Sequence, residues 1–89
     1  MRPLPRPAGG GVNSYTIAEL EELAELLTPE SPALEGVPVA ASYNSARHRA
    51  RTLQLGLRRI GLEVHIRTWP QREESGEVRW YWAVYLPDG

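Results

Sequence analysis

The feature that most constrains the fold is a pair of alternating segments, residues 62–69 and 78–86. Apolar side chains occupy every second position of each segment, which predicts two strands that each turn one face toward a core. The Glu-Ser-Gly sequence at residues 74–76 suits a three-residue hairpin loop with Gly76 in the left-handed conformation. The two segments are therefore expected to form an antiparallel hairpin.

The hairpin determines which side chains lie beside one another on its two faces. On the inward face, Trp80 and Trp82 alternate with aliphatic residues, and we interpret both tryptophans as core. On the outward face, the expected neighbours are His65 with Tyr85, Arg67 with Ala83, Trp69 with Tyr81, and Gln71 with Arg79. The outward face is thus predicted to combine aromatic rings with arginine.

Two further segments show helical periodicity. The first is expected to begin near Thr16, capped by Ser14 or Thr16, with Glu19 placed three residues beyond Thr16 to close a capping box. It is expected to end at the prolines that follow it. The second is expected to run from a cap at Asn44 or Ser45 to Gly61, because its apolar residues keep steps of four and three. Glutamates lie on the polar side of the first helix, and arginines lie on the polar side of the second.

The remaining strand is predicted at residues 37–41, a short apolar run between the two helices. Proline cannot donate to a strand ladder, so Pro38 and Pro70 place their strands at the two edges and leave residues 78–86 at the centre. The element order is α-β-α-β-β, and the three strands are ordered 1-3-2. The prediction is a small single-domain α+β fold, a split βαβ unit with a C-terminal hairpin and with helices packed on the sheet.

Composition bounds the organisation of the chain. Residues 1–13 hold three prolines and three consecutive glycines, which predicts a flexible tail before one domain over residues 14–89. The absence of cysteine excludes disulfides and thiolate zinc sites. The start lacks the apolar run of a secretory signal, and no stretch approaches the ~20 apolar residues of a membrane span. We therefore expect a cytoplasmic protein with no membrane partner.

Charge is distributed unevenly along the sequence. Residues 1–45 carry two arginines and six acidic residues, whereas residues 46–89 carry eight arginines and five acidic residues. This pattern predicts an anionic partner for the second half, or attraction between the two halves. The sequence pI near 6.1 argues against strong non-specific binding to nucleic acid.

The outward face supplies the candidate binding residues. Flat aromatic rings beside guanidinium groups are typical of proteins that stack single-stranded bases and hold the phosphate backbone. A second row of arginines follows one flank of the second helix at steps of four and seven. The predicted nucleic-acid or partner-binding residues are Arg67, Trp69, Arg79, Tyr81 and Tyr85 on the sheet, and Arg47, Arg51 and Arg58 on the helix.

Catalytic and metal-binding motifs are missing from the sequence. His48 and His65 are the only histidines, and no serine stands in a nucleophile-elbow motif. Neither histidine has a partner at the i, i+4 spacing of a helical zinc site. We therefore expect a non-catalytic accessory binding module with no catalytic residues, metal, cofactor or small-molecule substrate.

Three interpretations of the aromatic face stay open from the sequence alone. It binds single-stranded or structured nucleic acid, or the acidic first helix covers it, or it is a protein interface. The third includes a homodimer seam and an inhibitor or adaptor module of the kind that phages encode.

Overall fold

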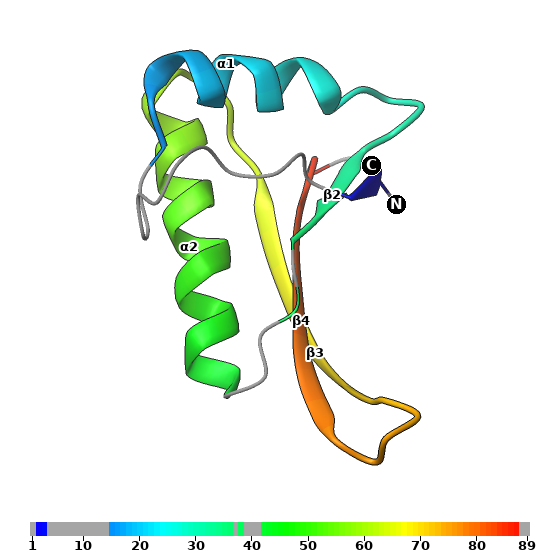
Figure 1. Ribbon diagram of the computed structural model, residues 1–89. Helices are drawn as coiled ribbons and strands as arrows, with labels where there is room; N and C mark the ends of the chain where they lie inside the picture. Colours follow the sequence, from blue (N-terminus) through cyan, green and yellow to red (C-terminus); the bar gives the residue numbers. More distant parts are fainter. Residues whose placement is uncertain (1, 4–14, 37, 39–41, 88–89) are drawn as a thin grey trace.

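The computed structural model describes residues 2–3, 15–36, 38 and 42–87 (Figure 1). The elements are β1 (Arg2–Pro3), α1 (Ile17–Leu26), β2 (Ala33–Glu35), α2 (Tyr43–Arg59), β3 (His65–Arg72) and β4 (Val78–Tyr85). Helix α2 packs along one face of the sheet, and α1 crosses the C-terminal end of α2 (Figure 1). Neither helix is long and apolar enough to cross a membrane.

The four strands form one sheet in the order β1-β2-β4-β3. Strands β2 and β3 are both antiparallel to β4, so they run parallel to each other with β4 between them. Helix α2 connects them, which confirms the predicted split βαβ unit, the α+β class and the order of the three predicted strands.

The hairpin has the predicted register. All four outward pairs are Cα partners, from His65 opposite Tyr85 to Gln71 opposite Arg79. Gly76 has a φ of 91°, and the amide of Glu73 donates to the Glu77 carbonyl at 2.8 Å to close the loop. Pro70 lies on β3, which pairs only with β4 among the described strands, as its missing donor predicts.

Both helix starts are set by side-chain caps. Thr16 caps α1, and Glu19 completes the predicted capping box. The prediction for α2 was wrong by two to three residues, because Ser42 is its cap instead of Asn44 or Ser45. The extended backbone of Ser42 lets its hydroxyl accept from the Ser45 amide at 3.2 Å, and this adds residues to the first turn.

The strand between the two helices lies earlier in the chain than the predicted residues 37–41. Strand β2 is Ala33–Glu35, and the fully buried Leu34 is the Cα partner of Val84. The Gly36 amide extends the ladder by donating to the Trp82 carbonyl at 2.9 Å. Pro38 is not in a strand, and residues 37 and 39–41 lie outside the described part of the chain.

Residues 1–13, which were expected to form a flexible tail, include the short strand β1. Arg2 and Pro3 pair in parallel with Leu34 and Glu35 as β1, so β2 is not an edge strand over these residues. The physical reason is that the outer backbone groups of β2 offer hydrogen-bonding positions to any nearby extended segment. The tail prediction for residues 4–13 lies outside the described residues.

The core lies between α2, α1 and the inward face of the sheet. Leucines dominate it, with Trp82 and two valines from the sheet side. Its members are Leu20, Leu23, Leu27, Leu34, Ala46, Ala50, Leu53, Leu57, Val64, Trp82 and Val84. Trp82 is 4% exposed, which confirms its predicted core role, and Trp80 packs against the cluster while partly exposed.

Gly36 is the position where the core tolerates no side chain. A Cβ at Gly36 would overlap the six-membered ring of Trp82, so Gly36→Ala must displace the indole. We expect it to lower the free energy of unfolding by about 3 kcal/mol, measured by urea denaturation. Gly76→Ala is the matched control, because a Cβ there meets nothing within 4 Å and only its positive φ costs about 1 kcal/mol. Equal losses in the two variants would contradict the packing argument.

Candidate functional site

The face of β3 and β4 that points away from α2 is not covered by either helix. Helix α1 turns its buried leucines into the core cluster. These are Leu20 and Leu23 of the helix and Leu27 at its C-cap. Leu20 reaches α2 at Gly56, where an added Cβ would lie 2.8 Å from Leu20 Cδ2. The interpretation that the acidic helix covers the aromatic face is therefore wrong for the described residues (Figure 1).

The centre of this face is a cross-strand aromatic pair. Trp69 and Tyr81 are Cα partners, and their ring centroids lie 5.8 Å apart with the planes 20° from parallel. The guanidinium carbon of Arg67 lies 5.3 Å from the centroid of the Trp69 ring. Both rings are partly exposed. The β3 and β4 ladder thus places two π surfaces and one cation together at the protein surface.

The tip of the hairpin adds a charged group to the pair. The Tyr81 hydroxyl donates to Glu73 Oε1 at 3.2 Å, and Arg79 Nε lies 3.9 Å from the same oxygen. Partial burial raises the pKa of the Tyr81 phenol above its usual value, and the negative charge of Glu73 raises it further. The phenol therefore stays protonated at neutral pH and keeps donating to Glu73.

The other end of the face holds a second ring pair and a shallow hollow. His65 and Tyr85 have centroids 5.5 Å apart. Next to them, Ala33, Ala83, Tyr85 and Arg67 line a hollow in the sheet, with prolines and Leu86 contributing the rest of its wall. Ala33 of β2 and Ala83 of β4 have short side chains, so neither fills the hollow.

Two acidic residues on this face were missed by the sequence reasoning. Glu35 is the Cα partner of Ala83 and so shares its face, and Glu73 lies at the hairpin tip. Glu35 was missed because the first strand was placed at residues 37–41. Glu73 follows β3 directly, and this position was the available signal. Arg67 and Arg79 therefore share the face with two carboxylates.

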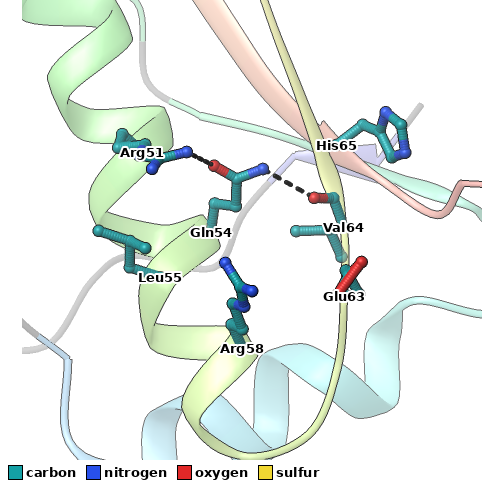
Figure 2. Close-up of a pocket in the computed structure, with 7 residues that line it drawn as sticks. All are labelled: Arg51, Gln54, Leu55, Arg58, Glu63, Val64 and His65. Carbon is teal, nitrogen blue, oxygen red and sulfur yellow. Dashed lines mark hydrogen bonds between the residues drawn. The ribbon is translucent and has the colours of Figure 1, made fainter.

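The arginine flank of α2 is exposed and divides into two parts. Arg51 and Arg58 line a cleft between α2 and the start of β3, together with Gln54, Leu55, Glu63, Val64 and His65 (Figure 2). Arg47 is also exposed but does not line this cleft. Within the described ranges, none of these three arginines forms an ion pair with a carboxylate.

The structure therefore groups seven of the eight predicted binding residues into two neighbouring sets, and Arg47 belongs to neither. Arg67, Trp69 and Tyr81 are in direct contact, and Arg79 joins them through Glu73. The Tyr85 ring lies against His65 at a tilt of 35°, and His65 also lines the cleft of Arg51 and Arg58. The role of Gln54 in that cleft had no signal in the sequence, because its partner lies on another element.

No group of three or more histidine, aspartate or glutamate side chains that could hold a metal ion occurs in the described part of the chain. Comparison with protein-family models, with curated proteins and with solved structures found no significant match.

The two kinds of tryptophan are expected to contribute differently to stability. Trp69→Ala removes a surface ring pair and should lower the free energy of unfolding by about 1 kcal/mol. Trp82→Ala opens a core cavity and should cost about 3–5 kcal/mol or unfold the domain. Chemical denaturation followed by circular dichroism measures both values. A loss for Trp69→Ala as large as that for Trp82→Ala would show that the outward face is core.

Proposed function

We propose that this chain is a non-catalytic module that binds single-stranded or structured nucleic acid through the outward face of β3 and β4. The observation that carries the proposal is the stack of Trp69 and Tyr81, which neither helix covers, with Arg67 beside it. The proposed setting is the cytoplasm, and the proposed activity uses no cofactor and no metal.

The aromatic pair provides the surface on which unpaired bases stack. Every base has a flat π face, so stacking on tryptophan and tyrosine tolerates different sequences and contributes about 1–3 kcal/mol per base. The hollow between Ala83, Ala33 and Tyr85 lies on the same face and gives a neighbouring base room to approach the backbone. A paired duplex hides its base faces, so the proposal favours single strands, loops and ends.

The arginines provide the attraction to phosphate. Arg67 lies on the face itself, and Arg51 and Arg58 line the cleft between α2 and the start of β3 without carboxylate partners among the described residues. Each phosphate contact releases condensed counterions, so binding weakens as salt rises. Glu35 and Glu73 on the same face oppose this attraction, which predicts modest affinity at physiological salt.

A second candidate is a protein interface, and the mixed charge of the face favours it. Arg67 and Arg79 lie on the same surface as Glu35 and Glu73, and a surface with both signs of charge is able to pair with a second copy of itself. A partner protein or a homodimer would then cover Trp69 and Tyr81. Sedimentation of the purified protein at several concentrations detects the homodimer directly.

The first functional prediction concerns the stacking surface. Trp69→Ala should weaken binding of a fluorescent oligonucleotide by about 5- to 100-fold at low salt, because it removes one stacking platform. Fluorescence anisotropy measures the dissociation constant, and quenching of tryptophan fluorescence reports contact with the rings.

The matched control is Tyr43→Ala. Tyr43 is an exposed aromatic residue at the start of α2, and its ring meets Trp80 edge-on at 5.4 Å, away from the outward face. This variant should bind like the wild type. Equal affinity of the wild type and Trp69→Ala, or binding that does not respond to salt, would contradict the proposal and favour a protein partner.

A further inference from the structure

The cleft between α2 and the start of β3 carries a feature that the aromatic face lacks, which is a pair of guanidinium groups on one concave surface. We infer that this cleft is a phosphate-binding subsite, in which Arg51 and Arg58 bind one backbone phosphate and Gln54 positions Arg51 (Figure 2). The inference rests on the proposed function, because the phosphate belongs to the strand that stacks on Trp69 and Tyr81.

Gln54 joins the helix to the sheet through two hydrogen bonds. Its Nε2 donates to the Val64 carbonyl oxygen at 2.9 Å, and its Oε1 accepts from Arg51 Nη1 at 2.8 Å (Figure 2). A carbonyl oxygen only accepts, so the Val64 carbonyl determines which end of the Gln54 amide faces Arg51. Gln54 therefore orients Arg51 through one of its N–H groups, and Arg51 donates no other side-chain hydrogen bond within the described residues.

This arrangement suits a tetrahedral oxyanion better than a neutral ligand. Two guanidinium groups at one site offer several N–H donors and two positive charges, and planar guanidinium groups match the oxygen geometry of phosphate. Arg51 and Arg58 are both exposed, and within the described residues neither forms an ion pair with a carboxylate. Their positive charge is therefore not neutralised by a bound carboxylate of this part of the chain.

Glu63 also lines the cleft and acts against an anion. Its carboxylate is exposed and shares the cleft with both arginines. The subsite therefore has a net positive charge of one from its arginines and glutamate. Removal of the Glu63 charge is expected to strengthen anion binding, which gives the inference a gain-of-affinity test.

The cleft is continuous with the aromatic face through His65. The Val64 side chain points toward α2, whereas the His65 ring lies on the other side of the strand (Figure 2). The His65 ring centroid lies 5.5 Å from that of Tyr85. Beyond β3 no further strand is paired among the described residues. A single-stranded nucleic acid whose bases stack on the outward face thus passes over the β3 edge at His65. Its phosphate backbone then reaches Arg51 and Arg58.

The test compares charge removal inside and outside the cleft. Arg51→Gln and Arg58→Gln should each weaken binding of a fluorescent single-stranded oligonucleotide about tenfold at low salt. The double variant Arg51→Gln/Arg58→Gln, which removes the one phosphate contact, should also make the plot of log affinity against log salt shallower by about 0.7. Arg59→Gln is the matched control, because Arg59 lines a separate pocket with Tyr15 and Ile17 on the α1 side of α2. It should weaken binding less than about threefold.

Two further variants separate positioning from charge. Gln54→Leu keeps both arginines but removes the hydrogen bond to Arg51, so it should weaken oligonucleotide binding. The thermal midpoint of this variant is measured in parallel, because Gln54 also bonds the Val64 carbonyl. Glu63→Gln should strengthen binding about threefold without affecting folding.

The outcomes distinguish the subsite from the proposed function. If the wild type binds no oligonucleotide at low salt, both ideas fail. If it binds and Trp69→Ala weakens it, while Arg51→Gln, Arg58→Gln and Glu63→Gln behave like Arg59→Gln, the proposed function stands and the phosphate subsite is overturned.

Discussion

Burial of the inward face of β4 under α2 is the interaction on which the rest of the structure depends. Trp82 and Val84 lie in the core with the apolar side of α2, and Leu34 is the Cα partner of Val84 from β2. In a chain of 89 residues without cysteine, few other contacts are available to stabilise the fold. Side chains alternate along a strand, so burying Trp82 and Val84 forces Tyr81 and Tyr85 onto the opposite face.

The position of α1 decides whether that opposite face has a use beyond packing. Its leucines fit against α2, with Gly56 leaving room for Leu20, so α1 lies across the helix instead of across the sheet. Trp69 and Tyr81 then stack on each other at the surface. Contiguous apolar patches at the surface of a small domain are typical of interaction sites, and for this reason the proposed function uses the Trp69 and Tyr81 pair.

The acidic side chains of α1 and the basic side chains of the cleft also lie on different parts of the molecule. The exposed glutamates of α1 lie at one end of the molecule, whereas Arg51 and Arg58 lie next to β3. The overall charge is close to balanced, so a global attraction to nucleic acid is weak. Local arrangement therefore matters more than net charge, and the hydrogen bonds of Gln54 show how one side chain orients an arginine beside an otherwise mixed surface.

The sequence by itself determined the features that depend on neighbouring residues. Alternation and the glycine of the turn were enough to predict the hairpin register, and the Thr16 capping box was enough to predict the start of α1. Only the tertiary structure decided the place of β2, the position of α1 and the partner of Gln54. Each of these depends on shape and hydrogen bonding between segments far apart in the chain. Strand β2 is placed by the fit of Leu34 and Gly36 against β4. The Gln54 side chain is placed by its hydrogen bond to the carbonyl of Val64, the residue directly before β3. Local patterns carry no information about such contacts, because the contacts exist only after the chain has folded.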